Sequence, residues 1–306
     1  MKIAVIGAGG VGGYFGARLA QAGHDVTFVA RGRHLAAIRE HGLAIESALG
    51  NATVRCPATD DLPALGPVDV AMLCVKLWDV DATAPQLADV VSNGGVVIPF
   101  QNGVESADRV AAVLGPAHVL GGVAYIAATI RAPGVIAHTG TMARLRVGAF
   151  PGGPDGRAAA YADACRSAGI EIELAPDIRR ALWEKFVFLA SFSGITSAAR
   201  VPIGVVRADP DLRATLEAAM REVSAVGRAR GVVLPDDFVA KQLAFADGLP
   251  AAMRSSMLND LESGFRLEVP WLSGAVARMA RESGLEAPVH ATLHAILKPY
   301  AGGRSA

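Results

Sequence analysis

The fold is decided by residues 2–12, which read KIAVIGAGGVG. The first five residues form a mostly apolar run that predicts a buried strand, and the run stops at Gly7. Residues 11–21 then carry apolar side chains at helical spacing until Gly23 ends them. The stretch therefore predicts a strand, a tight turn with the spacing G-x-G-x-x-G, and a helix.

A glycine motif between a strand and a helix predicts a dinucleotide-binding site. Gly7 permits the tight turn, Gly9 lets the backbone approach a pyrophosphate, and Gly12 allows the helix to pack closely on the strand. In a chain with 34 glycines the motif alone is weak, and the alternative is a purely structural turn. The strand-turn-helix context favours binding, and we expect cofactor contacts from Gly7, Ala8, Gly9, Gly10, Val11 and Gly12.

The rest of the first half continues this pattern of strands and helices. Further strands are expected at residues 25–30, 68–76 and 96–101, and helices at 33–41, 80–91 and 105–114. Such alternation predicts an α/β domain with a Rossmann-type, doubly wound parallel sheet covered by helices on both faces. A hairpin, residues 45–47 and 53–56 around Gly50-Asn51, is inserted into this plan.

The pattern changes after residue 119. Strands with turns at Pro133-Gly134 and Gly140 are expected up to residue 150, followed by a helix at 156–168 and a strand at 171–174. Beyond Pro176 the spacing predicts only helices, at residues 178–199, 211–230, 236–246, 255–262, 270–282 and 288–297. We expect a nucleotide-binding domain at 1–175 and an all-helical substrate domain at 176–306.

Composition excludes several classes of function. The 306 residues include 29 Lys plus Arg and 29 Asp plus Glu, so the net charge is zero and nucleic acid or a membrane surface is not an expected partner. Three separated cysteines and seven scattered histidines indicate neither a disulfide framework nor a metal site. No apolar stretch is long enough to span a membrane, and no signal peptide is recognised, so a cytoplasmic protein is expected.

The residue after the second strand selects the cofactor. NAD-selective sites place a carboxylate there to bind the ribose 2′-hydroxyl, but this sequence reads Ala30-Arg31-Gly32-Arg33. A guanidinium can form a bidentate pair with a 2′-phosphate, so Arg31 favours NADPH/NADP+ over NAD(H). The alternative is that Arg31 and Arg33 are solvated loop charges.

Two more polar residues follow strands of the predicted parallel sheet. Lys76 ends one strand and Asn102 follows the next, so both are expected at the sheet edge where open α/β folds bind ligands. Each also has an ordinary interpretation, because Asn-Gly is a common turn dipeptide and Lys76 can be a surface lysine.

The ordered set of motifs resembles the ketopantoate reductase (2-dehydropantoate 2-reductase) family. The set comprises the glycine motif, Val75-Lys76, Gln101-Asn102-Gly103, Trp183-x-Lys185, Ser255-Ser256-Met257 and Glu268, and it covers essentially the whole chain. The resemblance implies NADPH as reductant and a 2-keto acid bound in the cleft between the domains. It also implies that Lys185 and Glu268 are catalytic, that Asn102 and Ser256 contact substrate, and that Arg31 and Lys76 contact the adenosine phosphate.

Elementary chemistry agrees with these roles. Reduction of a ketone places negative charge on oxygen, so a cation or acid within hydrogen-bond reach lowers the barrier. Lys185 can act as both, and burial would lower its pKa toward a useful range. Glu268 can hold the ammonium group in place. Without the family pattern, a lone Lys or Glu on a helix is usually a solvated surface residue.

The chain departs from the family pattern on the helix that carries Lys185. The family commonly has asparagines four and eight residues after the lysine, and here these positions are Leu189 and Ser193. Because two amides are missing, we expect a 2-keto acid more apolar than ketopantoate, with Ser193 among the substrate-contacting residues.

A different class of function is also open, namely a non-catalytic NADP(H)-binding sensor. Such a protein would need the glycine motif and Arg31 but neither Lys185 nor Glu268. The apolar helical part is also compatible with a homodimer.

Overall fold

A computed structural model describes residues 1–150 and 152–304 and divides the chain into two compact units. The first unit comprises Met1–Gln101 and Glu105–Ala181, and the second comprises Asn102–Val104 together with the chain from Leu182 onward. The division at Ala181 lies within a helix, six residues beyond the boundary expected from the sequence. The short segment Asn102–Val104, which the sequence placed in the first domain, groups with the helical unit.

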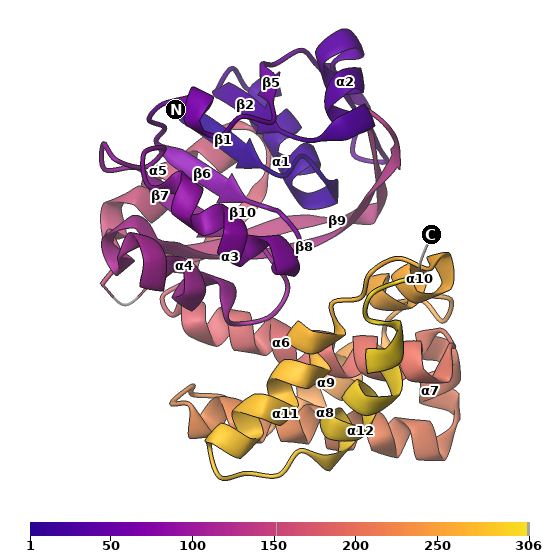
Figure 1. Cartoon of the computed structure of the whole chain (residues 1–306). Helices are drawn as coiled ribbons and strands as arrows, with labels where there is room; N and C mark the ends of the chain where they lie inside the picture. Colours follow the sequence, from indigo (N-terminus) through magenta and orange to yellow (C-terminus); the bar gives the residue numbers. More distant parts are fainter. Residues whose placement is uncertain (151, 305–306) are drawn as a thin grey trace. The chain divides into compact units, whose positions relative to one another are not determined.

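The first unit contains the expected parallel sheet. Its strands are β1 (Lys2–Ile6), β2 (Asp25–Val29), β5 (Ala58–Thr59), β6 (Val70–Leu73) and β7 (Val96–Pro99), in the order β5-β2-β1-β6-β7. All neighbours are parallel, and Ile6 is level with both Val29 and Leu73. The loops that follow these strands therefore leave the sheet at one edge (Figure 1).

Helices pack on this sheet, with one difference from expectation. The observed helices are α1 (Gly10–Gln21), α2 (Gly32–His41), α3 (Val80–Thr83) and α4 (Ser106–Leu114). The single helix expected at 80–91 is wrong, because α3 ends at Thr83 and a 3₁₀ turn, Ala84–Leu87, follows it. Pro85 in that turn has no N–H to donate to the preceding turn, so the α-helix cannot continue.

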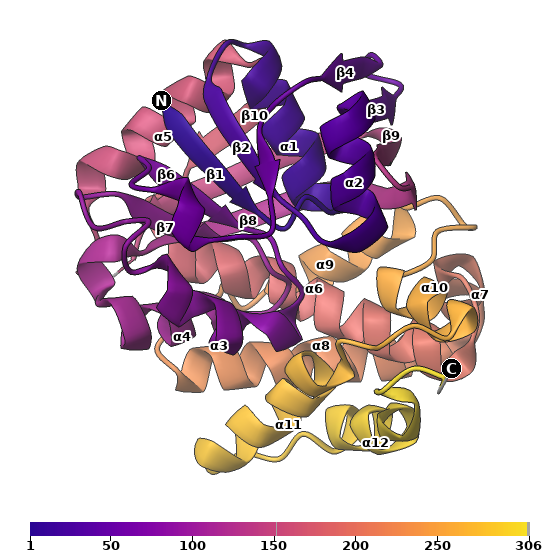
Figure 2. The same ribbon diagram turned by 45° about the horizontal axis from the view of Figure 1, so that its top comes forward.

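A second sheet covers α1 on the side away from the first. It consists of β3 (Leu43–Ser47), β4 (Ala52–Val54), β8 (Leu120–Ala132), β9 (Val135–Ala149) and β10 (Glu171–Leu174). Their order is β10-β9-β3-β4, with β8 antiparallel to β9. The hairpin expected around Gly50-Asn51 is confirmed as β3 and β4, but it belongs to this second sheet (Figure 2). Helix α1 contacts β8 and β9 as well as β1 and β2, so it is packed between two sheets.

The expected turn at Gly140 is wrong. β9 runs through this position, and Gly140 has a φ of +75° inside an irregularity of the β8–β9 pair. Ile126 pairs with Ala143 and Ala128 pairs with His138, so β9 has extra residues opposite one residue of β8. A glycine with positive φ here produces a bulge, and the strand continues. Helix α5 (Asp155–Ser167) then leads to β10, as predicted.

The second unit is helical, as expected. Its helices are α6 (Ile178–Ala199, whose first turn belongs to the first unit), α7 (Ile203–Ala208), α8 (Pro210–Ala229), α9 (Phe238–Asp247), α10 (Ser256–Ser263), α11 (Ser273–Glu282) and α12 (Pro288–Leu297). Helix α7 was not predicted, because it is only six residues long. The helix expected at 270–282 begins at Ser273, after the 3₁₀ turn Val269–Trp271.

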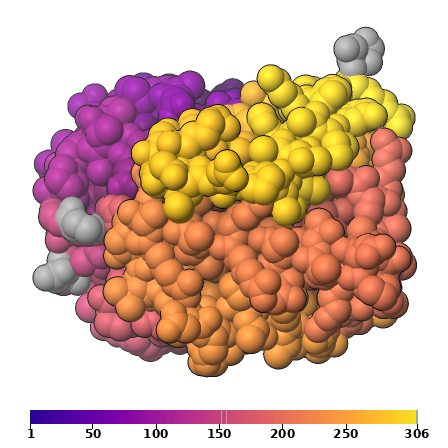
Figure 3. Space-filling model, turned by 90° about the horizontal axis from the view of Figure 1, so that it is seen from below, coloured from indigo at the N-terminus to yellow at the C-terminus, as the bar shows by residue number. Residues whose placement is uncertain are grey.

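The helical unit has its own apolar core. Side chains from α6, α8 and α11 are almost completely buried in it, including Phe186, Met220 and Val276. Figure 3 shows part of the surface of this unit, coloured orange to yellow. Among the described residues, no helix is long and apolar enough to cross a membrane.

Candidate active site

Residues 7–12, the glycine loop, connect β1 to α1. The N–H groups of Gly7 and Ala8 both donate to the carbonyl of Val29, at 3.1 and 3.0 Å. Gly7 has a φ of +103°, and a Cβ there would lie 2.8 Å from the backbone of Cys74, so only glycine fits the turn. A Cβ at Gly9 would meet nothing within 4 Å, so the space beside this residue is open.

The start of α1 is suited to an anion. Its first turn contains no acidic residue, and within the described chain Gly9 supplies no side-chain cap. The first N–H groups of a helix have no partner inside the helix, and they carry the positive end of the helix dipole. Together with the open side of Gly9, these donors fit the pyrophosphate of a dinucleotide.

Two cations follow strands of the first sheet at the same edge. Arg31 lies directly before α2 and is exposed, and no side chain in residues 1–150 or 152–304 pairs with it. Lys76 follows β6 and is also exposed, with its Nζ 5.6 Å from the ring centroid of Trp78. Their positions suit a phosphate-bearing ligand at the edge where β2 and β6 end.

The helical unit brings together three residues that are far apart in the sequence. The Nζ atom of Lys185 on α6 donates to Oδ1 of Asn102, at 3.0 Å. Nδ2 of Asn102 in turn lies 3.4 Å from Oε2 of Glu268 and donates to it. We call Lys185, Asn102 and Glu268 the lysine cluster. Its central amide is oriented by its neighbours, because the oxygen faces an ammonium donor and the nitrogen faces a carboxylate acceptor.

The lysine cluster controls the proton affinity of Lys185. Burial disfavours the charged ammonium, and the carboxylate of Glu268 partly offsets this effect, so the pKa of Lys185 is lowered from its ordinary value to about 8. Glu268 itself is only 8% exposed. The cluster therefore holds a partly buried lysine that can release a proton close to neutral pH.

Ser256, another residue expected to contact substrate, is not part of the lysine cluster. Ser256 is exposed at the start of α10, whereas the neighbouring Ser255 is buried. Ser255 Oγ accepts from the N–H of Leu258, at 3.1 Å, and lies 2.8 Å from Oγ1 of Thr196 on α6. The sequence analysis quoted Ser255 as part of a motif and expected it inside the helix at 255–262 but gave it no role, although a serine directly before a helix is a common N-cap.

On the face of α6 beyond Lys185, the side chains are apolar, buried or already hydrogen-bonded within the helix. Leu189 is partly buried, and Ser193 is 1% exposed. Among the described residues, the Ser193 hydroxyl has no hydrogen-bond partner. Thr196 Oγ1 donates to the carbonyl of Phe192, at 2.7 Å, so its only proton is already used. This face offers few donors to a ligand.

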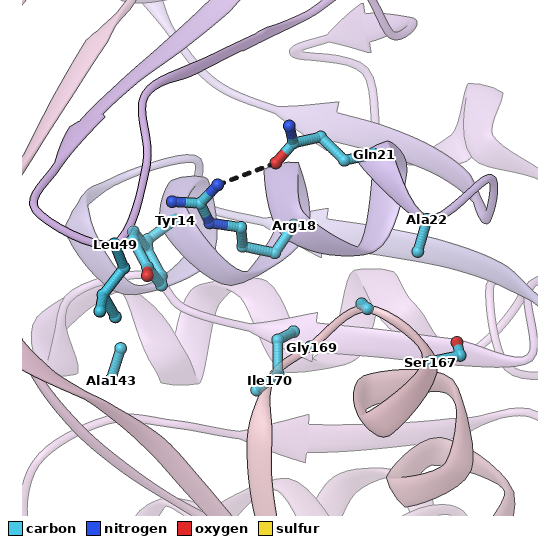
Figure 4. Close-up of a pocket in the computed structure, with 10 residues that line it drawn as sticks. Tyr14, Arg18, Gln21, Ala22, Leu49, Ala143, Ser167, Gly169 and Ile170 are labelled. Carbon is cyan, nitrogen blue, oxygen red and sulfur yellow. Dashed lines mark hydrogen bonds between the residues drawn. The ribbon is translucent and has the colours of Figure 1, made fainter.

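A separate cavity of about 410 Å³ lies at the other end of α1. Figure 4 shows it between α1, Leu49 of the β3–β4 turn, Ala143 of β9 and the segment Ser167–Ile170. The Arg18 guanidinium donates to Gln21 and to the carbonyl of Gly50, and it lies over the Tyr14 ring. Along α1 the lining runs from Tyr14 to Gln21 and includes no residue of the glycine loop. The contacts of Arg18 tie the hairpin to α1.

Comparison with known families matches both parts of the chain. The model described as Ketopantoate reductase PanE/ApbA matches residues 3–152, and the model for the C terminal part of the same family matches residues 177–301. The 2-dehydropantoate 2-reductase of Archaeoglobus fulgidus is 32% identical over 302 residues, which cover 99% of this chain and 98% of that protein. An uncharacterized oxidoreductase, YkpB, of Bacillus subtilis is 31% identical over 98% of this chain and 99% of its own.

Solved structures agree. A PanE/ApbA family ketopantoate reductase from Ralstonia eutropha JMP134 superposes with a TM-score of 0.90 at 32% identity, and the match covers 98% of both chains. A D-mandelate dehydrogenase solved with NADH and anilino(oxo)acetate shares the fold, with a TM-score of 0.88 at 20% identity over 98% of both chains. The chain therefore belongs to the ketopantoate reductase PanE/ApbA family and is a 2-keto acid reductase of the NAD(P)H-dependent kind.

Proposed function

We propose that this protein uses NADPH to reduce a 2-keto acid to the 2-hydroxy acid, with Lys185 as the general acid. The observation that carries this proposal is the lysine cluster, in which Lys185, Asn102 and Glu268 are joined by hydrogen bonds of 3.0 and 3.4 Å. An NADP(H)-binding sensor would have no use for a partly buried lysine whose pKa is lowered to about 8.

Lys185 supplies the proton in this proposal. NADPH, when bound, supplies a hydride to the carbonyl carbon of the substrate. Negative charge then develops on the carbonyl oxygen, where the Lys185 ammonium can donate a hydrogen bond and transfer its proton. The Nζ–H bond breaks, an O–H bond forms, and the neutral amine is reprotonated from solvent. Asn102 holds Nζ in place, and Glu268 orients Asn102 and favours the charged form of Lys185.

The glycine loop and Arg31 support NADPH over NADH. The loop offers backbone donors to a pyrophosphate, and Arg31 has an exposed guanidinium for the 2′-phosphate. Lys76 follows the neighbouring strand and supplies a second cation at the same sheet edge. No carboxylate follows β2 directly to accept the ribose 2′-hydroxyl of NAD(H).

The face of α6 supports a substrate more apolar than ketopantoate. Leu189 contributes an isobutyl group, the Ser193 hydroxyl is enclosed, and the Thr196 hydroxyl is committed to Phe192. A buried substrate hydroxyl without a partner costs about 1–3 kcal/mol. We therefore propose that a 2-keto acid with an apolar side chain is preferred and that ketopantoate is a secondary substrate.

Steady-state kinetics test both parts of the proposal. The purified protein is mixed with NADPH or NADH and with ketopantoate, its analogue 3,3-dimethyl-2-oxobutanoate, or other 2-keto acids, and absorbance of the reduced nicotinamide is followed. We expect turnover with NADPH and a higher kcat/KM for 3,3-dimethyl-2-oxobutanoate than for ketopantoate. No turnover with any 2-keto acid would overturn the reductase assignment. A clear preference for ketopantoate would overturn only the role given to Leu189 and Ser193.

A further inference from the structure

His34, on the first turn of α2, bridges the glycine loop and the β8–β9 turn. Its Nε2 lies 2.8 Å from the carbonyl oxygen of Ala8, and its Nδ1 lies 2.9 Å from the backbone nitrogen of Gly134. A carbonyl can only accept and a backbone N–H can only donate, so the ring is neutral and carries its proton on Nε2. Both ring nitrogens are thus occupied by backbone groups.

The hydrogen bond to Ala8 fixes the plane of the Ala8–Gly9 peptide. A trans peptide is planar, and its C=O and N–H point in opposite directions. Because the Ala8 carbonyl is held toward His34, the N–H of Gly9 points to the other side. The N–H groups of Gly7 and Ala8 are already bonded to Val29, so Gly9 is the first loop residue whose N–H remains for a ligand.

This peptide needs such a constraint. Gly9 has no side chain to restrict its φ and ψ, and a Cβ built there would meet nothing within 4 Å, so no side-chain packing at Gly9 fixes the preceding peptide. Within residues 1–150 and 152–304, His34 is the donor recorded against the Ala8 carbonyl. A rotated peptide would direct the carbonyl oxygen, rather than the N–H, toward an incoming anion.

We propose that His34 is a positioning residue that holds the Gly9 N–H in the orientation needed for the dinucleotide pyrophosphate. The Gly134 N–H fixes the ring from the other side, so the β8–β9 turn contributes to cofactor binding without touching the cofactor. This inference rests on the proposed use of NADPH. The inference gives a role in cofactor binding to His34, which belongs neither to the glycine motif nor to the cations expected to bind the 2′-phosphate.

The experiment compares two ligands on matched variants. His34→Phe retains a ring but removes both hydrogen bonds, whereas His34→Gln retains one donor and one acceptor on its amide. His24→Phe is the control, because His24 is a partly buried histidine whose Nε2 contacts Ala164 and Ser167, away from the loop. Dissociation constants are measured for NADPH by nicotinamide fluorescence and for 2′-AMP, which has no pyrophosphate, by calorimetry.

We expect His34→Phe to weaken NADPH binding about 10- to 100-fold and to change 2′-AMP binding less than about twofold, since one backbone contact is misdirected. His34→Gln should recover most of the NADPH affinity, and His24→Phe should leave both constants unchanged. Unchanged NADPH binding by His34→Phe would overturn the inference. Equal weakening of both ligands would also overturn it, because His34 would then support the fold in general.

Two further outcomes are covered by the design. If the wild-type protein binds neither NADPH nor 2′-AMP, the proposed cofactor is wrong, and the inference about His34, which rests on it, is overturned as well. If His34→Phe does not fold, as judged by circular dichroism, His34→Asn takes its place, because its shorter amide can reach at most one partner. The expected ligand pattern and the contrary outcomes are then the same.

Discussion

The glycine loop and the lysine cluster are built in opposite ways. The loop is six consecutive residues whose backbone groups form the ligand site, and its side chains are small so that backbones can approach each other. The lysine cluster uses side chains from three segments, and Asn102 lies 83 residues from Lys185 and 166 residues from Glu268. Backbone N–H groups give a binding site whose donors do not themselves gain or lose protons near neutral pH. Side-chain donors give a group that can gain and lose a proton.

The largest expected effect is on turnover, and it follows from replacing Lys185, which belongs to the lysine cluster and not to the glycine loop. Lys185→Ala should lower kcat by about 10²–10⁴, the usual contribution of a positioned general acid, and leave NADPH binding intact. Lys241→Ala is the control, because Lys241 is an exposed lysine paired with Asp237. Single-turnover kinetics and fluorescence titration measure the two quantities. Loss of NADPH affinity in step with kcat would show that the regions are not independent.

The reciprocal change is made at Arg31. Arg31→Ala should reduce the preference for NADPH over NADH by about 1.5–3 kcal/mol, roughly 10- to 150-fold, because the 2′-phosphate loses a charge-assisted partner. Turnover at saturating NADPH should be nearly unchanged. The ratio of kcat/KM values for the two cofactors is the measurement, with Arg33→Ala, in the first turn of α2, as the matched variant. Equal affinity for both cofactors in the wild-type protein would contradict the role of Arg31.

A pH series sharpens the contrast between backbone and side-chain donors. Lys185 must be protonated to act as an acid, and its pKa is about 8, so the reduction rate should fall about tenfold per unit above that pH. NADPH affinity should stay flat over the same range, because the backbone N–H groups of the glycine loop do not titrate there. Glu268→Gln removes the carboxylate that raises the Lys185 pKa, so the fall should begin at a lower pH. If the reduction rate of the Glu268→Gln variant falls at the same pH as that of the wild-type protein, Glu268 does not influence the proton affinity of Lys185.

The smallest expected effect concerns the neighbour of the cluster on α6. Leu189→Asn restores an amide four residues after Lys185, on the same helix face. We expect kcat/KM for ketopantoate to rise about 2- to 10-fold relative to 3,3-dimethyl-2-oxobutanoate, the scale of one net hydrogen bond. Leu189→Ala controls for lost volume. If both variants shift the ratio equally, packing rather than hydrogen bonding sets the preference.

The same contrast explains what the sequence predicted. β1, α1 and the turn between them form one local pattern, and α6 was predicted with its observed ends because its apolar spacing is uninterrupted. The second sheet was not predicted as a separate layer, because strand pairing between β3 and β9 joins residues about 90 apart and leaves no local signal. Helix α7 was missed because a six-residue segment is too short to show periodicity.

The site shows the same limit. Lys185, Asn102 and Glu268 were identified together only through the ordered family motifs, since neither composition nor spacing shows that they meet. The hydrogen bonds of His34 and the cap formed by Ser255 depend on the folded backbone. The contacts of His34 join segments that no spacing rule connects, whereas the Ser255 cap joins residues three apart and could have been predicted from a serine directly before a helix.

The grouping of Asn102–Val104 with the helical unit limits how the chain can be cut into working pieces. The polypeptide passes from one unit to the other after Gln101, after Val104 and after Ala181, so no single cleavage separates the two. A fragment expressed from residue 182 onward would contain Lys185 and Glu268 without the amide that joins them. A chimaera that exchanges the helical unit between relatives must therefore carry three residues from the middle of the other unit's sequence, or it will graft a lysine that lacks its partner.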